Sequence, residues 1–371
     1  MKENEPEWIE VGAATELSRS SLAPVSVGEA RVALSCVGGE FGAISNICNH
    51  VGGPLGQGRL DGDYVVCPWH QWKFHRQTGA GEPGFEADRV PSHAVKVVDG
   101  RLYVSARPVT RRGRLAHPPL PLAREPQRAP GPVRVAGIST TAMDPNNPRY
   151  STSDALLTSA LEGARASHGA EVKLVKLNDL GFKHCGGYYS RAARACTWPC
   201  SITQMDTKDE LVEVYELIVH WADVLLIATP IRWGAASALY YKMVERMNCI
   251  QNQITLHNNV LIRDKVAAFI ITGGQDNVQA VAGQMCGFFG ELGFVLPPFP
   301  FIGHSLGWTA EDMERNVEFV RMHEGLHAGA RELAARAINV SERLIAKSMS
   351  TGHIERGGRK ANIPSRAPHS S

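Results

Sequence analysis

The chain has 371 residues, of which 43% are hydrophobic and 20% are charged, and 39 basic residues nearly balance 37 acidic ones. This length and composition predict two or three domains with sizeable cores and exclude a wholly disordered chain. The net charge of +2 gives no electrostatic reason to expect a nucleic-acid partner or an anionic membrane surface.

Residues 7–106 have the pattern of an all-β domain. Short apolar or alternating runs are separated by Gly-Gly and Asp-Gly turn signals, and Asp99-Gly100 predicts a β-hairpin. The expected strands are Ala30–Val37, Phe41–Asn46, Tyr64–Val66, Ala94–Val98 and Leu102–Ser105.

The composition changes over residues 107–132, which hold seven of the 22 prolines, several arginines and almost no hydrophobic periodicity. This favours a stiff, partly polyproline linker at 108–131 after a first domain at 1–107. The alternative is a meandering surface loop of one larger domain.

From Val133 onward, apolar strands alternate with longer helices, which predicts a doubly wound parallel sheet with helices on both faces. We place this α/β domain at 132–348 and expect the polar residues 349–371 to form a disordered tail. The expected strands are Val133–Ile138, Glu171–Leu177, Val224–Ala228, Val266–Thr272 and Phe294–Phe301. The expected helices are Thr152–Ser167, Asp209–Trp221, Ala235–Asn248, Val278–Leu292 and Glu311 to about Ala346.

Two cysteine–histidine pairs stand out in the all-β part. Cys48-Asn49-His50 precedes Cys67-Pro68-Trp69-His70, so each of two short loops carries one thiolate and one imidazole. Two cysteines and two histidines could form a tetrahedral zinc site, but zinc fingers place the cysteines together and the histidines together. The alternating order suits a Rieske 2Fe-2S centre, in which two Cys hold one iron and two His hold the other.

The stretch from about 7 to 107, with its segment CPWHQWKF, resembles the Rieske family. This resemblance implies a 2Fe-2S cluster with Cys48, His50, Cys67 and His70 as ligands. High-potential members of the family carry an extra cysteine on each loop and a serine after the second histidine. Gly53 and Trp69 stand at the cysteine positions, and Gln71-Trp72 follows His70, so the resemblance implies a low-potential, ferredoxin-type centre at about −150 mV.

The loops after the α/β strands predict a flavin site. Ser139 ends the first strand, and Ser151-Thr152-Ser153 opens the following helix, where hydroxyls and backbone N–H groups suit a phosphate. Ser and Thr at a helix start are equally typical of ordinary N-caps. No G-x-G-x-x-G motif and no P-loop is present, which disfavours a dinucleotide-binding half and a kinase.

The segments T-P-I-R-W-G and T-G-G-Q-D resemble loops of the flavodoxin-like NAD(P)H-dependent FMN reductase family. The resemblance covers about 132–345, and Arg232 replaces the family's usual aromatic residue. It implies FMN as cofactor, NAD(P)H as co-substrate and association into a homo-oligomer. The implied phosphate contacts are Ser139, Ser151, Thr152 and Ser153, and the implied ring contacts are Pro230, Ile231, Arg232, Trp233, Gly234, Gly273, Gly274 and Gln275.

A third group, Cys185, Cys196 and Cys200, follows the second α/β strand. FMN reductase relatives can carry a compact four-cysteine motif for a 4Fe-4S cluster in this region, but this chain has only three cysteines there. A fourth ligand would have to be Cys249, Cys286 or His184. A second cluster, a redox-active or substrate-contacting thiol, and a structural role remain open.

Together these features predict an enzyme, an iron–sulfur flavoprotein oxidoreductase that passes electrons from NAD(P)H through FMN and the Rieske centre to an oxygenase or another redox protein. The alternatives are a non-enzymatic electron carrier or redox sensor, and a quinone or nitro reductase fed through the Rieske centre. No catalytic acid or base is assigned. No apolar run approaches the roughly 20 residues of a membrane span, and the polar start does not resemble a signal peptide, so we expect a cytoplasmic protein.

Overall fold

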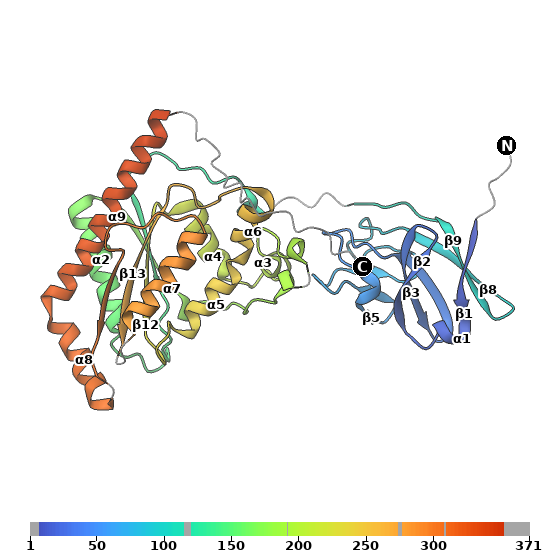
Figure 1. Ribbon diagram of the computed structural model, residues 1–371, viewed down its shortest axis with the longest axis horizontal. Coiled ribbons are helices and arrows are strands. Elements are labelled where there is room, and N and C mark those ends of the chain that lie inside the picture. The colour runs from blue at the N-terminus through green and yellow to red at the C-terminus, as the bar shows by residue number, and fades with distance from the viewer. Residues whose placement is uncertain (1–6, 115–119, 191, 274–276, 308, 352–371) are drawn as a thin grey trace, which may run out of the picture. The chain divides into compact units, whose positions relative to one another are not determined.

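The computed structural model describes residues 7–114, 120–190, 192–273, 277–307 and 309–351 (Figure 1). The chain forms two compact units, one comprising Met1–Pro118 with Gly187–Ala195 and the other Pro119–Gly186 with Cys196–Ser371. The polypeptide therefore enters the first unit twice. The domain limits expected from the sequence stay predictions.

The first unit is all-β, as the sequence predicts. Its larger antiparallel sheet has the order β1-β9-β8-β4-β3-β2, and a smaller sheet has the order β5-β6-β7. The strands are β1 (Trp8–Ala13), β2 (Leu22–Val27), β3 (Ala30–Val37), β4 (Glu40–Ser45), β5 (Arg59–Asp61), β6 (Tyr64–Val66), β7 (Lys73–His75), β8 (Ser92–Val98) and β9 (Arg101–Pro108), with the short helix α1 (Ala14–Leu17) after β1.

Apolar packing covers both faces of the larger sheet. Side chains alternate across a strand, so Ala33 joins one buried cluster while Val32 and Leu34 join another. The first cluster also contains Cys48 and Cys67, so the packing of the first unit holds both thiols. The predicted β8–β9 hairpin is present, and Asp99 and Gly100 both adopt the positive φ that its tight turn requires.

The second unit contains a five-stranded parallel sheet with the order β11-β10-β12-β13-β14. This is the flavodoxin-like order 2-1-3-4-5, so the predicted fold class is confirmed. The strands are β10 (Arg134–Ser139), β11 (Glu171–Lys176), β12 (Val224–Pro230), β13 (Val266–Gly273) and β14 (Phe301–Ser305).

Helices cover both faces of this sheet. Helices α2, α8 and α9 lie on one side, and α4, α5, α6 and α7 lie on the other (Figure 1). Their bounds are α2 (Thr152–His168), α3 (Ser201–Met205), α4 (Leu211–Tyr215) with a π-helical continuation (Glu216–Trp221), α5 (Ala238–Arg246), α6 (Asn248–His257), α7 (Val278–Glu291), α8 (Ala310–Met322) and α9 (Glu324–Thr351).

Several predicted element limits were wrong. The last strand was expected at Phe294–Phe301, but β14 begins only at Phe301, because three prolines in that stretch remove backbone donors from the ladder. The predicted helix from Glu311 breaks at His323, whose backbone is extended. The helix expected at Ala235–Asn248 begins only after the N-cap Ser237, and α6 follows it.

The predicted tail 349–371 starts inside α9, and its residues 352–371 lie outside the described part of the chain. Among the described helices, none combines the length and apolar composition that a bilayer crossing requires.

Candidate metal centre and flavin site

Two similar turns carry the Cys–His pairs. Cys48 lies in the loop after β4, and Cys67 lies directly after β6. The carbonyl of Cys48 accepts a hydrogen bond from the Gly52 N–H at 3.1 Å, and the carbonyl of Cys67 accepts one from the Gln71 N–H at 3.0 Å. Gly52 and Gln71 both have positive φ, so each turn folds back after its histidine.

The four predicted ligands converge as two pairs. The Cys48 thiol donates to the Cys67 sulfur, which lowers the pKa of Cys67 to about 7 and raises that of Cys48. The Nδ1 atoms of His50 and His70 lie 2.9 Å apart. Within the described residues, no three such side chains surround a single ion position. Two pairs, one sulfur and one nitrogen, are the donor set that a cluster with two irons requires.

Gly53 lies against this site without room for a side chain. A Cβ atom at Gly53 would lie 2.7 Å from the Cys67 Sγ atom and 3.1 Å from the Trp69 ring. Gly53 and Trp69, which stand where high-potential Rieske proteins would carry their extra cysteines, therefore face each other across the two loops. The close approach requires glycine at position 53.

The two imidazoles are held by their surroundings. The His50 ring stacks on Trp72 with centroids 4.9 Å apart, and the His70 ring meets Tyr188 edge-on at 5.1 Å. The His70 Nε2 lies 2.7 Å from the Ala195 carbonyl oxygen. Because a carbonyl only accepts, Nε2 carries the proton and Nδ1 keeps a lone pair for a metal. Burial lowers the pKa of His70, which favours this neutral form.

Residues on either side of the β8–β9 hairpin hold the loop that carries Cys48 and His50. No sequence pattern indicated their role. Asn49 Nδ2 donates to the carbonyls of Arg89 and Gly113 at 3.1 and 2.7 Å. Arg112 donates to Asn49 Oδ1 and, at 3.1 Å, to the Ile47 carbonyl. Arg112 lies in the Pro- and Arg-rich segment that we interpreted as a linker from its composition. That interpretation gave no reason to expect Arg112 at the Cys–His loop.

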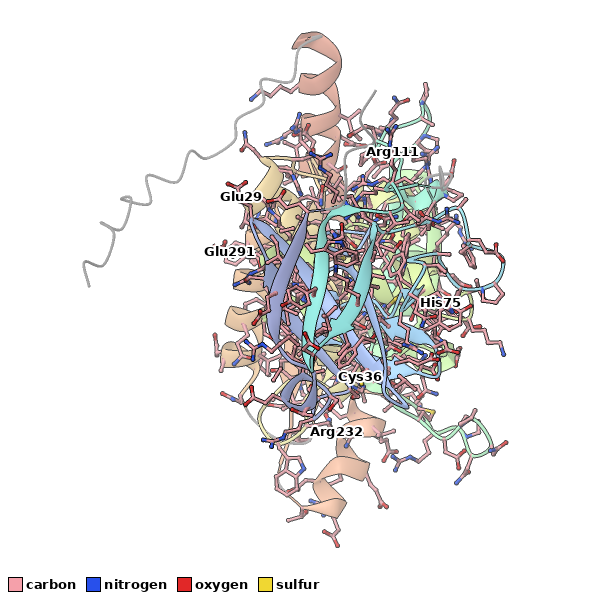
Figure 2. The ribbon with its side chains drawn as sticks, turned by 90° about the vertical axis from the view of Figure 1, so that its right-hand side faces the viewer. Glu29, Cys36, His75, Arg111, Arg232 and Glu291 are labelled. Carbon is pink, nitrogen blue, oxygen red and sulfur yellow. The ribbon has the colours of Figure 1, made fainter. Side chains whose placement is uncertain are left out.

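Two other side chains of the first unit that could bind a metal, Cys36 and His75, are labelled in Figure 2. Cys36 lies on β3 and is partly buried. His75 lies on β7, where its ring meets Tyr64 at 5.6 Å. Neither contacts the four predicted ligands in any interaction described for the first unit.

In the second unit, three of the four predicted phosphate residues, Ser139, Ser151 and Ser153, form one polar cluster with Thr141 and Asp154. Ser139 donates to the Asp154 carboxylate at 2.5 Å, and Thr141 Oγ1 lies 3.1 Å from Ser151 Oγ and 2.9 Å from Ser153 Oγ. Thr152 is separate, since its hydroxyl lies 2.7 Å from that of Thr272 at the end of β13. These side chains meet where β10 gives way to α2, beside the switch point of the strand order.

Sequence reasoning missed Thr141 and Asp154 in this cluster, and Thr272 beside Thr152. Thr141 contacts more hydroxyls than Ser139 does. Its position two residues after the end of β10 was the available signal. Thr272 comes near α2 only because β13 pairs with β12, which the local sequence does not reveal.

The predicted ring loops lie side by side. The Ile231 N–H donates to the Thr272 carbonyl at 2.7 Å, and the Asn277 side chain donates to the Gly234 carbonyl at 2.5 Å. A Cβ at Gly273 would lie 2.7 Å from that of Ile231. Pro230 ends β12, Arg232 is exposed, and Trp233 is 94% exposed on a backbone of positive φ. The predicted contacts Gly274 and Gln275 lie outside the described residues.

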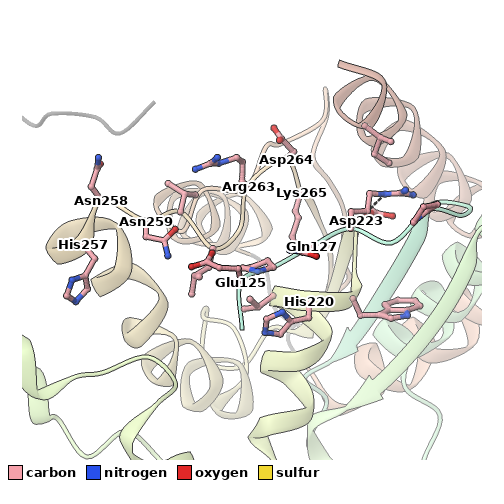
Figure 3. Close-up of a pocket in the computed structure, with 18 residues that line it drawn as sticks. Glu125, Gln127, His220, Asp223, His257, Asn258, Asn259, Arg263, Asp264 and Lys265 are labelled. Carbon is pink, nitrogen blue, oxygen red and sulfur yellow. Dashed lines mark hydrogen bonds and ion pairs between the residues drawn. The ribbon is translucent and has the colours of Figure 1, made fainter. Parts of the chain in front are cut away.

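A pocket of about 1020 Å³ lies elsewhere in the second unit (Figure 3). Its wall includes Asp223 and Lys265, which directly precede β12 and β13. It therefore opens at the amino ends of the parallel strands, whereas the predicted flavin loops follow their carboxyl ends. Burial lowers the pKa of Lys265 to about 8. The pocket is distinct from the predicted flavin site.

Comparison with known proteins matches both units. Residues 7–94 match the Rieske [2Fe-2S] domain, and residues 139–306 match the NADPH-dependent FMN reductase family. Ferredoxin CarAc of Metapseudomonas resinovorans is 35% identical over 101 residues, which cover 26% of this chain and 92% of that ferredoxin.

Two other proteins are similar to part of this chain. The 8-demethyl-8-aminoriboflavin-5'-phosphate synthase of Streptomyces davaonensis is 30% identical over 80 residues, 22% of this chain and 31% of the enzyme. The crystal structure of RosB with a bound 8-demethyl-8-formylriboflavin-5'-phosphate aligns with a TM-score of 0.46 at 18% identity, covering 64% of this chain and 95% of that chain.

The all-β fold with paired Cys and His loops, followed by a flavodoxin-like sheet, defines an iron–sulfur flavin redox protein. Its cofactors are a 2Fe-2S cluster and FMN. The chain belongs to the Rieske [2Fe-2S] family through residues 7–94 and carries an NADPH-dependent FMN reductase domain in residues 139–306.

Proposed function

We propose that Cys48 and Cys67 hold one iron of the cluster through sulfur and that His50 and His70 hold the other through Nδ1. The convergence of these side chains as a sulfur pair and a nitrogen pair supports this assignment. The Ala195 carbonyl fixes the His70 tautomer, and Trp72 fixes the plane of the His50 ring.

FMN is bound by the polar cluster around Thr141 and by the two ring loops. Ser139, Ser151, Thr152 and Ser153 supply hydroxyls to the phosphate, together with backbone N–H groups at the start of α2. Pro230 to Gly234 and Gly273 flank the ring. The backbone bond between Ile231 and Thr272 keeps the two ring loops together.

The protein acts as an NAD(P)H-dependent oxidoreductase. When bound, FMN would supply two-electron chemistry with a nicotinamide and one-electron chemistry with the cluster, and the cluster held by the Cys and His pairs would supply single electrons to an oxygenase or another redox protein. The observation that carries this proposal is the environment of His70. Tyr188 and Ala195, which contact its ring, belong to the segment of sequence that matches FMN reductases.

The test is anaerobic mixing of the full chain, loaded with both cofactors, with NADPH and with NADH. We expect the flavin absorbance to bleach first and the electron paramagnetic resonance signal of the reduced cluster to follow. A His70→Ala variant should show flavin bleaching alone. The proposal fails if neither nucleotide reduces the flavin, or if the cluster of the wild-type protein stays oxidised after the flavin is reduced.

A second measurement addresses the direction of electron flow. A midpoint potential of the cluster of about −150 mV, at the low end of the Rieske range, would suit a donor to an oxygenase. Protein-film voltammetry measures it directly. A midpoint well above zero would contradict the donor role and leave electron entry through the Rieske centre.

A further inference from the structure

Four cysteines gather in a part of the second unit that the proposed electron path does not use. Cys196 is close enough to Cys185 and Cys200 for their charges to interact, and Cys200 is within hydrogen-bonding reach of Cys249. Cys200 and Cys249 are both free thiols. The arrangement around Cys200 and Cys249 differs from simple core packing because it includes a buried ion pair.

Arg246 provides the charge in this arrangement. Its side chain is fully buried and pairs with the equally buried Asp209, with Nη2 2.7 Å from Oδ2. The Nη groups also donate to the Lys183 carbonyl at 2.8 Å and to Thr203 Oγ1 at 2.9 Å. The Nε–H is directed elsewhere, to the Cys200 sulfur at 3.2 Å.

Two N–H donors converge on the Cys200 sulfur, and a second thiol lies beside it. The donors are the Arg246 Nε–H and the backbone N–H of Ile202, and the Cys249 thiol is within hydrogen-bonding reach of the same sulfur. A neutral thiol is a weak acceptor, whereas a thiolate accepts several hydrogen bonds. The Cys249 hydrogen bond first, and then the charge of Arg246, lower the pKa of Cys200 to about 5 against the opposing effect of burial.

Cys249 has the opposite character. Its sulfur lies 3.3 Å from the Arg246 carbonyl and 3.7 Å from the Tyr215 hydroxyl, and the residue is completely buried. Burial raises its pKa well above the usual value, so it keeps its proton. The site therefore pairs a stabilised thiolate with a neutral thiol.

We propose that Cys200 and Cys249 form a peroxide-reactive thiol pair, with Cys200 as the attacking sulfur and Cys249 as the resolving thiol. The Cys200 thiolate attacks one oxygen of hydrogen peroxide, the O–O bond breaks, and hydroxide leaves with a sulfenic acid on Cys200. Cys249 then displaces that hydroxyl, so an S–S bond forms and one water leaves. Both cysteines are oxidised by one electron each and the peroxide is reduced. A small dithiol, able to reach the 8%-exposed Cys200, supplies two electrons and two protons and so restores the pair.

The packing selects small oxidants. Cys200 is 8% exposed and Cys249 is 0% exposed, so a peroxide can approach the first sulfur while bulky disulfides are kept away. Cys286, partly buried on α7, is the matched control because burial raises its pKa and no interaction described for it involves another thiol.

The test treats the reduced full-length holoprotein with one equivalent of hydrogen peroxide and maps its cysteines by mass spectrometry. We expect a Cys200–Cys249 disulfide as the main product and an unmodified Cys286. In a Cys249→Ser variant, dimedone should label Cys200, at least tenfold more than Cys286. In Cys200→Ser, neither product should form, while Cys286→Ser should behave as the wild type.

Two outcomes overturn the proposal. One is wild-type protein in which peroxide yields no Cys200–Cys249 link although another cysteine is oxidised. The other is iron-dependent protection of Cys200 from iodoacetamide, which would make it a metal ligand. Both are measured on the unmutated chain, so a variant that fails to fold does not prevent a decision.

Discussion

The Rieske loops and the flavin loops of this protein are built in different ways. Each Rieske loop places a cysteine and a histidine within four residues, and one backbone hydrogen bond to the cysteine carbonyl closes each turn. The flavin loops come from three strands, and only the sheet order brings them together. A donor set contained in short loops can be identified from sequence spacing, whereas one assembled by a sheet requires the topology.

The strongest test of this contrast removes one Rieske ligand. His70→Ala takes away one of two imidazoles, so the cluster should be lost almost completely while FMN stays bound to its separate core. Iron analysis and the electron paramagnetic resonance signal measure the loss, and the released flavin measures the retention. His75→Ala, on β7 in the same unit, should keep full cluster content. A normal signal from His70→Ala would disprove the ligand assignment.

The next effect concerns the close contact between the two ring loops. In Gly273→Ala the new Cβ would meet the Ile231 Cβ at 2.7 Å, so the loops must separate. We expect the dissociation constant of FMN to rise at least tenfold, about 1.4 kcal/mol, by flavin fluorescence titration. Gly283→Ala on α7, where a Cβ meets nothing within 4 Å, is the control. Equal affinity in both variants would show that these loops do not hold the ring.

A smaller effect is expected from the polar cluster. Thr141→Val keeps the shape of the side chain but removes the hydroxyl that contacts Ser151 and Ser153. Losing about one hydrogen bond's contribution, roughly 1 kcal/mol, should weaken FMN binding about fivefold. Thr255→Val, whose hydroxyl contacts only its own helix, should leave the affinity unchanged. If both variants bind FMN as the wild type does, the phosphate lies elsewhere.

The last effect concerns stability rather than flavin binding, and it separates the amino ends of the strands from the flavin loops. The pKa of Lys265 is about 8 in the folded protein, below the usual 10.5, so protonation of this amine favours the unfolded chain. The protein is not destabilised in this way above pH 10.5, and it loses stability as the pH falls from 10.5 to 8. Lys265→Met should therefore raise the free energy of unfolding at pH 7 by up to about 2 kcal/mol, with a higher Tm, and should raise both by less near pH 10. FMN affinity should stay constant. A gain independent of pH would contradict the lowered pKa.

Much of the fold could be predicted from the sequence. The convergence of Cys48, His50, Cys67 and His70 could also be predicted, because each Cys–His pair lies in a turn whose geometry is local. Their role as cluster ligands stays a prediction. Thr272 and Asn277 could not be found in this way, because their contacts depend on which strands are neighbours. The late strand β14 was misplaced because apolar residues between prolines mimic a strand without supplying its donors.

The same reasoning explains why Ala195 was not predicted. It contacts His70 through a backbone carbonyl, which every residue possesses, and it lies 125 positions away along the chain. No residue type or spacing reports such a partner. The oligomeric state of the protein also stays a prediction, and light scattering of the holoprotein tests it.

The return of the chain to the first unit at Gly187–Ala195 limits how far the protein is modular. A gene cut at the Pro-rich segment would yield a ferredoxin-like fragment with all four predicted ligands but without the acceptor of the His70 proton. The remaining fragment would keep Gly187–Ala195, a segment that belongs to the first unit, without the rest of that unit. Recombination at that segment would thus transfer the first unit without Gly187–Ala195. We therefore expect the two parts of this chain to be inherited together.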